Sequence, residues 1–336
     1  MKRREIVCEY QPYILYQPVR ADQLRANAVS ADNATINVWE ETWLKNIKAN
    51  KEFFGDFHKH SLGNLFGKYL HRPVIIAGSG PSLKYNAKEL VNRGEIPLIS
   101  CLHNFHYFED NGVNPEYYVS LDAGPVVLEE IAEGGAKTPD EYWELTKDRK
   151  LIAFIGSDPR LFEKWQGEKY VFNAPVPSAD YEDKVDAIES FHCMVSNGGN
   201  VLGACLYIAK GYFGAGAIVF VGADFSFGYD RKFHSWDSKY DKEMGNCVPV
   251  YDVYGHKVPT WQSYKNFKDW FDWVSIKVPG IYINCSEGGC LGSYADGNLH
   301  TIKQMDLTDC LDMFNMSRHI KEQAIKPQDA VKRILF

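Results

Sequence analysis

The chain has 336 residues, of which 45% are apolar and 24% charged, and these proportions exclude a disordered or low-complexity protein. A chain of this length buries a hydrophobic core without disulfide staples, as one large domain or two small ones. The formal net charge of −7 gives no strong signal for duplex nucleic-acid binding. Aromatic residues reach 14%, which suits either an aromatic core or sites that stack planar ligands.

The eight cysteines are scattered, without a C-x-x-C pair or the spacing of zinc ligands. We therefore expect reduced thiols in a cytoplasmic protein. The first residues contain no apolar run followed by a small-residue cleavage site, and no stretch approaches about eighteen consecutive apolar residues. We expect no export signal and no membrane span, and the composition leaves the oligomeric state open.

Residues 1–72 are predicted to form an N-terminal extension and a helical preface. Residues 1–35 are polar and predicted to be irregular, with short strands around Ile14. Residues 37–70 are predicted to be helical because Trp39, Trp43 and Ile47 recur at helical spacing among polar residues. We expect the preface to pack on the main domain, and a surface for a partner is the alternative.

Residues 73–305 alternate between apolar runs and helical patterns. This predicts an α/β domain with a Rossmann-like, mostly parallel sheet and helices on both faces. The apolar runs have no polar breaks, as in strands that are buried on both faces. The expected strands are 74–78, 96–102, 117–124, 151–157, 170–175, 217–227 and 281–286. The expected helices are 84–93, 126–135, 159–166, 197–214 and 260–275, and another at 305–325 lies in a helical C-terminal segment, 306–336.

A glycine-rich turn with the sequence GSGPS follows the first expected strand and opens a helix. Gly78 and Gly80 let the backbone approach a phosphate closely, and free amides at a helix start point at it. Ser79 and Ser82 can add hydroxyl donors, and Pro81 suits the first helical turn. The motif is neither G-x-G-x-x-G nor a P-loop. A plain structural connection is therefore the alternative to phosphate binding.

Two carboxylates, Asp122 and Asp224, each end an apolar strand. Ligands of parallel α/β sheets bind beyond the carboxyl ends of the strands, which places both residues, with Gly222, in the expected nucleotide site. There a carboxylate can hold Mg²⁺ with substrate phosphates, contact a ribose or act as a base. A helix N-cap or a turn is the alternative for either residue alone.

The loop FGYDRKFHSWD follows the second of these strands and is expected to reach the mouth of the site. His234 is its candidate general base, and Arg231 or Lys232 can stabilise a leaving phosphate. A solvated loop with a structural histidine is the alternative. His103 and His106, at another strand end, are the second candidates among the histidines.

Other strand ends and helix starts carry polar and glycine residues. The NGGN sequence starts a small-residue helix that can take an anion or a base edge, and SEGG follows the last long strand as a backbone turned inward under a ligand. Plain turns are the alternative for both. The remaining candidates for nucleotide binding are Asn104, Asn197, Gly198, Glu287, Gly288 and Gly289.

Taken in order, these motifs resemble those of the MptE-like family. The resemblance rests on VIIAGSGPSL, PEYYVSLDAGP, a small-residue helix leading into VFVGADFSF, the nearby His234, and INCSEGGCLGS, and it covers about residues 37–305. That family includes archaeal 6-hydroxymethylpterin pyrophosphokinases, and its domain recurs in bacterial motility accessory factors and many phage proteins. The preface WEETWLKNIKANKEFF is similar to the bacterial and phage branch.

The same core is similar to bacterial sialyltransferases of the Cst type, which carry a comparable glycine turn, a later G-x-D-F strand end and a downstream catalytic histidine. This resemblance implies that the residues from Gly78 to Ser82 hold a nucleotide, that Asp224 lies beside it and that His234 is the base. Asp122 and the SEGG turn instead resemble the motifs of the MptE-like family.

Three functions follow as hypotheses. The first is a glycosyltransferase that uses a nucleotide sugar such as a CMP-linked nonulosonate, with His234 deprotonating the acceptor and no obligatory metal. The second is a Mg-ATP-dependent pyrophosphokinase acting on a hydroxymethylpterin-type alcohol, with Asp122 and Asp224 placing Mg²⁺ on the phosphates. The third is a module that binds a nucleotide or a sugar without turnover. Both enzyme hypotheses transfer a group from a nucleotide to a small-molecule hydroxyl, and we place glycosyl transfer slightly ahead.

Overall fold

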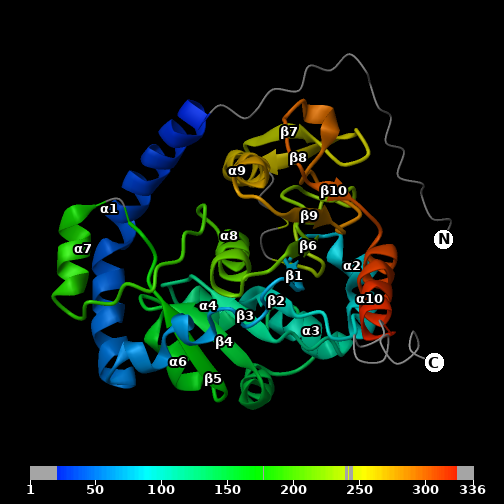
Figure 1. Ribbon diagram of the computed structural model, residues 1–336. Coiled ribbons are helices and arrows are strands. Elements are labelled where there is room, and N and C mark those ends of the chain that lie inside the picture. The colour runs from blue at the N-terminus through cyan, green and yellow to red at the C-terminus, as the bar shows by residue number, and fades with distance from the viewer. Residues whose placement is uncertain (1–20, 177, 239–240, 242–244, 324–336) are drawn as a thin grey trace, which may run out of the picture.

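The computed structural model describes residues 21–176, 178–238, 241 and 245–323. Within these residues the chain forms an eight-stranded sheet with helices around it, which confirms the predicted α/β, Rossmann-like architecture (Figure 1). All neighbouring strands of this sheet are parallel, in the spatial order β10, β9, β6, β1, β2, β3, β4, β5. A separate antiparallel hairpin pairs β7 with β8.

The bounds of the elements are as follows. The strands are β1 Pro73–Ala77, β2 Leu98–Cys101, β3 Tyr117–Ser120, β4 Lys150–Phe154, β5 Glu168–Phe172, β6 Ala217–Val221, β7 Cys247–Tyr251, β8 Lys257–Trp261, β9 Ile281–Asn284 and β10 Lys303–Gln304. The α-helices are α1 Ala21–Phe54, α2 Leu83–Asn86, α3 Phe105–Asn111, α4 Val126–Glu130, α5 Pro139–Leu145, α6 Pro159–Lys164, α7 Ala179–Asp186, α8 Val201–Tyr207, α9 Gln262–Lys277 and α10 Leu307–Gln323.

The central strands are buried along their length, as their unbroken apolar sequences predict. Every residue of β2, β3 and β6 is buried, and β1 is buried from Val74 onward. Ile75 of β1 is in register with Leu98 of β2 on one side and with Val219 of β6 on the other. Helix α8 packs over β1, β2 and β3. The hydrophobic core therefore lies between the sheet and its covering helices.

The preface is helical, but its bounds differ from the prediction. Helix α1 begins at Ala21 and ends at Phe54, so residues 21–35 are not irregular. That segment is rich in alanine, which favours a helix without supplying the apolar periodicity on which the prediction relied. Gly55 adopts a left-handed conformation and stops the helix, and two short 3₁₀ helices follow instead of helix to residue 70. Ile14 lies outside the described residues.

Most of the other elements are also shorter than predicted, and three of them show the largest differences in form. The helix expected at 84–93 is divided into α2 and a 3₁₀ segment, Ala87–Asn92. The strand expected at 217–227 ends at Val221, because Gly222 takes a φ of 60° and turns the chain. The helix expected at 197–214 begins only at Val201, after a turn with two left-handed glycines, and continues as a π-helix over Ile208–Tyr212.

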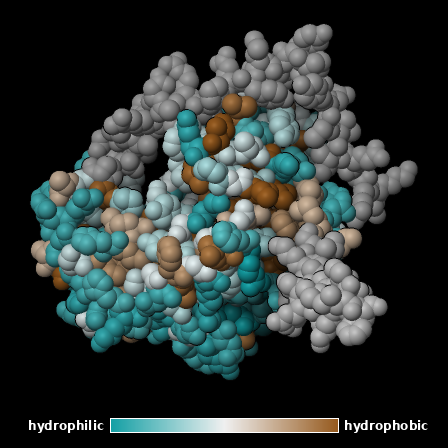
Figure 2. Space-filling model, in the orientation of Figure 1, coloured by the Kyte–Doolittle hydropathy of each residue, from teal (hydrophilic) through white to brown (hydrophobic). Residues whose placement is uncertain are grey.

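The β7–β8 hairpin was not predicted. Each of its strands contains a proline, and Pro249 lies opposite Pro259 in the register. Proline removes a backbone donor and normally argues against a strand. The sequence pattern therefore did not predict the pairing of β7 with β8. On the face shown in Figure 2, hydrophobic surface gathers in the upper half around this hairpin, and the lower margin of the molecule is mostly hydrophilic.

Within the described part of the chain, no helix combines the length and apolar character needed to cross a bilayer. The cysteines of that part are free, as expected. The boundaries predicted at residues 72 and 305 stay predictions.

Two buried asparagines of α1 fasten the preface to the sheet. The Asn46 amide donates to the carbonyls of Ala123 and Gly156, each at 3.0 Å. One turn later, the Asn50 amide donates to the carbonyls of Ile155 and Ser157 at 2.8 and 2.9 Å. These carbonyls belong to the loops that follow β3 and β4. The preface therefore holds in place the carboxyl-end loops on one half of the sheet, including the loop of Asp122.

Replacement of Asn50 by alanine is expected to lower the free energy of unfolding by about 1–3 kcal/mol, because two buried carbonyls lose their donor. Denaturant unfolding of the purified protein measures this change. The matched control is Asn64→Ala, since Asn64 is exposed and also donates to a backbone carbonyl, that of Lys59. Equal effects of the two substitutions would show that the Asn50 bonds do not fasten α1.

Candidate functional site

The strand order reverses between β1 and β6. From β1 the chain adds β2, β3, β4 and β5 outward on one side, and it then returns to place β6 on the other side. Ligands of open parallel sheets bind beyond the carboxyl ends of the strands at such a reversal. The GSGPS turn follows β1 and the GAD sequence follows β6, so the two motifs lie side by side at this point.

The two turns interlock through their backbones. The Gly78 amide donates to the Val221 carbonyl and the Gly80 amide to the Gly222 carbonyl, both at 2.9 Å. A Cβ on Gly78 would lie 2.5 Å from the Gly222 oxygen, and a Cβ on Gly222 would lie 2.6 Å from the Gly78 oxygen. Only glycine permits this approach from both sides. The turns are therefore a fixed structural unit, and the amides of Gly78 and Gly80 are bound within it.

Asp224 joins the same unit through its side chain. Its carboxylate accepts the Ser82 amide at 3.1 Å and the Ser82 hydroxyl at 2.6 Å, and the residue is only 3% exposed. A Cβ on Gly80 would collide with this carboxylate. Burial raises the pKa of Asp224 to about 7, although the Ser82 hydrogen bonds lower it. Asp224 is thus a buried link between the turns.

This arrangement bears on the magnesium site expected at Asp122 and Asp224. Both oxygens of Asp224 already accept hydrogen bonds from Ser82, so this carboxylate is poorly placed to coordinate an ion. Among the described residues, no group of three or more His, Cys, Asp or Glu side chains is arranged to hold a metal. The burial of Asp224 and its bonds to Ser82 therefore disfavour an ion shared by the two carboxylates, whereas Asp122 has exposed surface.

The SEGG turn packs behind Asp224. The Gly289 backbone lies against that of Asp224, whose carbonyl accepts the Cys290 amide at 2.7 Å. Glu287 accepts the amide of Leu307, the first residue of α10, at 3.0 Å. A recess of about 70 Å³ beside these residues is lined by Pro81, Tyr85, Tyr254 and Gly288 among others. It is far smaller than the roughly 300–1,000 Å³ of ligand pockets, so it can take only a part of a nucleotide.

A further predicted residue, Asn104, supports the backbone. The Asn104 amide donates to the Gly78 carbonyl at 2.9 Å and to the Ser100 hydroxyl at 3.0 Å, and Asn104 is fully buried. It therefore holds the glycine turn from behind.

The NGGN sequence forms the turn that leads into α8. Asn197 accepts the Gly199 amide at 2.8 Å, and Asn200 caps α8 by accepting the Gly203 amide at 2.9 Å. Gly198 packs against the ring of Trp270 on α9, where a Cβ would lie 2.7 Å from the indole. Asn197 and Gly198 thus shape the chain at the start of α8.

A cluster of histidines lies around the loops that follow β2 and β6. The His103 Nε2 lies 2.8 Å from a carboxylate oxygen of Glu133. The ring of His103 is 4.8 Å from that of His234, between centroids, and His234 stacks on Trp236. The predicted base is thus adjacent to His103, the second candidate. Glu133 and Trp236 were not predicted: Trp236 lies in the expected FGYDRKFHSWD loop but was not singled out, and no motif surrounds Glu133.

The two histidines differ in accessibility. His234 is 5% exposed, and burial, followed by the charge of His103, lowers its pKa to about 3. Burial likewise lowers the pKa of His106 to about 4. The imidazoles of His234 and His106 are therefore neutral and weakly basic at neutral pH. His103 retains some exposed surface, and the Glu133 carboxylate orients its ring.

Asp122 lies beside this cluster. Its side chain has exposed surface, yet enough protein surrounds the carboxylate to raise its pKa, while the charge of His103 lowers it. His103 and Asp122, at the ends of the neighbouring strands β2 and β3, therefore interact electrostatically next to the glycine turn. This pair brings together an ionisable ring and a solvent-accessible carboxylate.

The loop that carries His234 is fixed to the glycine turn by Ser235. The Ser235 hydroxyl donates to the Gly80 carbonyl at 2.7 Å and accepts the Lys84 amide at 3.0 Å. The sequence placed this loop at the site but did not single out Ser235. Arg231 is exposed in a tight turn of the same loop, and Lys232 is paired with Asp237.

Comparison with known proteins supplies two similarities. The family model described as 6-hydroxymethylpterin diphosphokinase MptE-like matches residues 41–230. Among solved structures, the MAf glycosyltransferase from Magnetospirillum magneticum AMB-1 is similar, with 18% identity and a TM-score of 0.50. That match covers 70% of this chain and 34% of the other, so the chain spans about a third of the length of this neighbour. No curated protein matches.

The buried carboxyl of Asp224 leads to a pH-dependent stability. A pKa raised from its ordinary value of 3.8 to about 7 means that the folded state favours the protonated form. The contribution of Asp224 to the free energy of unfolding is therefore greatest below about pH 4. It falls as the pH rises to 7, by about 4 kcal/mol at most.

Asp224→Asn keeps an acceptor for Ser82 and removes the titration. Urea unfolding at pH 5 and pH 8 is expected to show that the wild type loses more stability between the two values than the variant. Ser82→Ala should increase the loss of stability between pH 5 and pH 8, because the Ser82 hydroxyl favours the charged form of the Asp224 carboxylate. Parallel pH profiles of wild type and Asp224→Asn would contradict the raised pKa.

Proposed function

The chain belongs to the 6-hydroxymethylpterin diphosphokinase MptE-like family, and we propose that it is a nucleotide-dependent transferase that acts on a substrate hydroxyl. The observation that carries the proposal is the juxtaposition of the glycine turn after β1 with His103 and Asp122 after β2 and β3. A nucleotide bound at the strand reversal would present its phosphates beside these two side chains.

Glycosyl transfer is the reaction that we place first. In it the acceptor hydroxyl loses its proton to a base and forms a bond to the anomeric carbon. The bond from that carbon to the donor phosphate breaks, and its electron pair leaves with the nucleotide. The link between Asp224 and Ser82 favours this reaction over pyrophosphoryl transfer, because it occupies one of the two carboxylates that a shared magnesium ion would need. The structurally similar protein is named as a glycosyltransferase, which agrees with placing glycosyl transfer ahead of pyrophosphoryl transfer.

We assign the proton-accepting role to His103 in this reaction. A carboxylate that hydrogen-bonds one ring nitrogen fixes the tautomer and stabilises the imidazolium that forms, and Glu133 is placed for this at 2.8 Å. His234 was the candidate from the sequence, but its burial and its pKa of about 3 make it a weaker acceptor. We propose that His234 instead supports the ring of His103.

The leaving phosphate needs donors that the protein has not already used. Gly78, Gly80 and Ser82 donate their amides within the protein. Of the two serines in the turn, Ser79 is partly exposed and Ser82 is buried. We therefore propose Ser79 as the phosphate contact of this turn, with the neighbouring glycines giving the close approach.

A thermal-shift panel of CMP, CDP, UDP, GDP, ATP and AMP, each with and without Mg²⁺, identifies the donor. A ligand that binds only the folded state raises the unfolding midpoint. We expect stabilisation by CMP or another pyrimidine nucleotide without Mg²⁺. Stabilisation by ATP only with Mg²⁺ would favour the pyrophosphokinase, and no shift with any nucleotide would contradict both enzymes and favour a module that binds a sugar.

Variants then separate the two histidines. With the nucleotide sugar of the stabilising nucleotide, His103→Gln is expected to lower nucleotide release by about a hundredfold or more while nucleotide binding persists. His234→Gln is the matched control, and its rate of nucleotide release should fall by a smaller factor. A larger loss in His234→Gln would return the role of base to that residue.

A further inference from the structure

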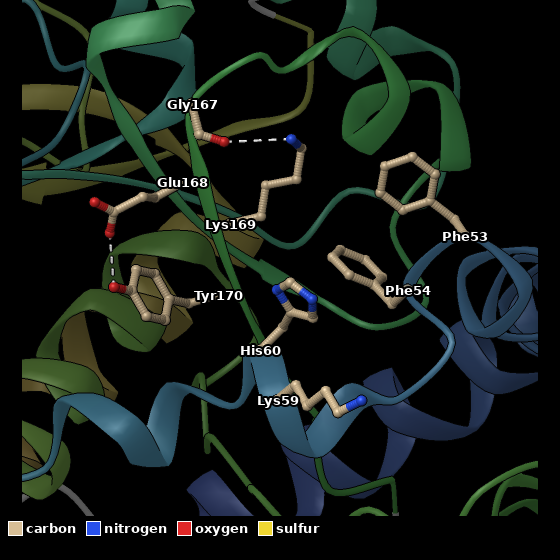
Figure 3. Close-up of a pocket in the computed structure, with 8 residues that line it drawn as sticks. All are labelled: Phe53, Phe54, Lys59, His60, Gly167, Glu168, Lys169 and Tyr170. Carbon is tan, nitrogen blue, oxygen red and sulfur yellow. Dashed lines mark hydrogen bonds between the residues drawn. The ribbon is translucent and has the colours of Figure 1, made fainter.

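A cavity outside the proposed transfer site lies at the edge strand β5, on the opposite side of the sheet from β6. It is lined by Phe53 and Phe54 at the end of α1, by Lys59 and His60, and by the first residues of β5 with the preceding glycine, Gly167–Tyr170 (Figure 3). β5 is an edge strand, four positions from β1, and these residues lie at its amino end. The proposed transfer site lies at the carboxyl ends of the strands. The cavity is therefore distinct from that site.

Its walls are held in place by the fold. Asp56 caps the 3₁₀ helix Phe57–His60, and Ser61 forms a parallel bridge to Val171 of β5. Lys59 and His60 are thereby fixed beside the edge strand. The volume of about 460 Å³ falls within the roughly 300–1,000 Å³ of pockets that bind small molecules. The cavity is thus large enough, and sufficiently preformed, for a small organic ligand.

One side of the cavity is aromatic. The rings of Phe53 and Phe54 meet edge to face with centroids 5.0 Å apart, and the His60 ring is 4.8 Å from that of Phe54. Phe53 is 48% exposed, so its ring is accessible from the solvent. Figure 3 shows His60 between the two phenylalanines and Tyr170. Such a wall suits a flat ring, which can stack or meet these rings edge to face.

The charges around the cavity favour an anion. Lys59 and Lys169 both line it. The Lys169 ammonium donates to the Gly167 carbonyl at 3.3 Å, which accounts for one of its three hydrogens, and burial lowers its pKa. The acidic residue on the wall, Glu168, already accepts the Tyr170 hydroxyl at 2.8 Å and pairs with Lys150 at 3.1 Å. Its charge is thus compensated, and the two lysines leave a positive balance.

We propose that this cavity is a second ligand site, which binds a small organic anion that carries an aromatic ring. Lys169 would contact the anionic group, and Phe53, Phe54 and His60 would contact the ring. Lys59, on the opposite side of the cavity in Figure 3, would add to the positive potential. This inference does not rest on the proposed transfer reaction.

Isothermal titration with phenyl phosphate tests the proposal. Saturable binding is expected, together with much weaker binding of inorganic phosphate, which lacks the ring, and of benzyl alcohol, which lacks the charge. Lys169→Met retains the apolar stem and removes the charge-assisted hydrogen bond, so the Kd should rise about tenfold or more. Phe53→Ala should also raise it, and since Phe53 is half-exposed this variant is expected to fold normally.

Two controls locate the binding. Lys164→Met removes an exposed lysine of α6 outside the cavity and should leave the Kd unchanged. Asp122→Asn, at the proposed transfer site, should also leave it unchanged. The proposal is overturned if phenyl phosphate does not bind saturably, if Lys169→Met and Phe53→Ala bind it like the wild type, or if Asp122→Asn changes the Kd as much as Lys169→Met does, which would place the ligand at the transfer site.

Discussion

The contact on which the site depends is the crossing of two glycine turns at the strand reversal. Gly78 and Gly222 approach so closely that neither has room for a side chain, and the backbone bonds beside them draw β1 and β6 into one rigid edge. Asp224 completes the crossing by accepting both donors of Ser82. A buried carboxyl with a raised pKa is costly unless it is well hydrogen-bonded. The two bonds from Ser82 offset part of this cost and fix the side chain of Asp224 between the two turns.

Other contacts extend this rigidity to the loops that carry ionisable groups. Ser235 binds the His234 loop to the Gly80 carbonyl, and Asn104 holds the turn from behind. On the far half of the sheet, Asn50 of α1 performs the equivalent task for the loop after β4. The proposed reaction therefore takes place on backbone that is anchored from several directions, with His103 and Asp122 as its more accessible ionisable side chains.

The sequence predicted the parallel sheet well, because unbroken apolar runs such as VIIA and AIVFV have no other explanation in a chain with this alternation. It also placed the glycine turn and both carboxylates at strand ends. It could not distinguish Asp224, whose oxygens are enclosed by Ser82, from Asp122, whose side chain has exposed surface, because burial arises from packing between distant segments. The roles of Glu133 and Ser235 depend on the same long-range contacts and leave no local pattern. The prolines of the β7–β8 hairpin argued against strands at positions where the structure has them.

The mutual approach of Gly78 and Gly222 also has a consequence for how such a protein can diversify. A substitution at either position requires the opposite turn to move, so single mutations there are blocked, and the crossing is inherited as a pair. The loop after β2 and the segment around His234 are joined to the crossing through the side chains of Asn104 and Ser235 and not by a backbone interlock, so they can change one residue at a time. New ligand preferences can therefore arise around an unchanged backbone crossing, and attempts to redirect the protein by design should start from those loops.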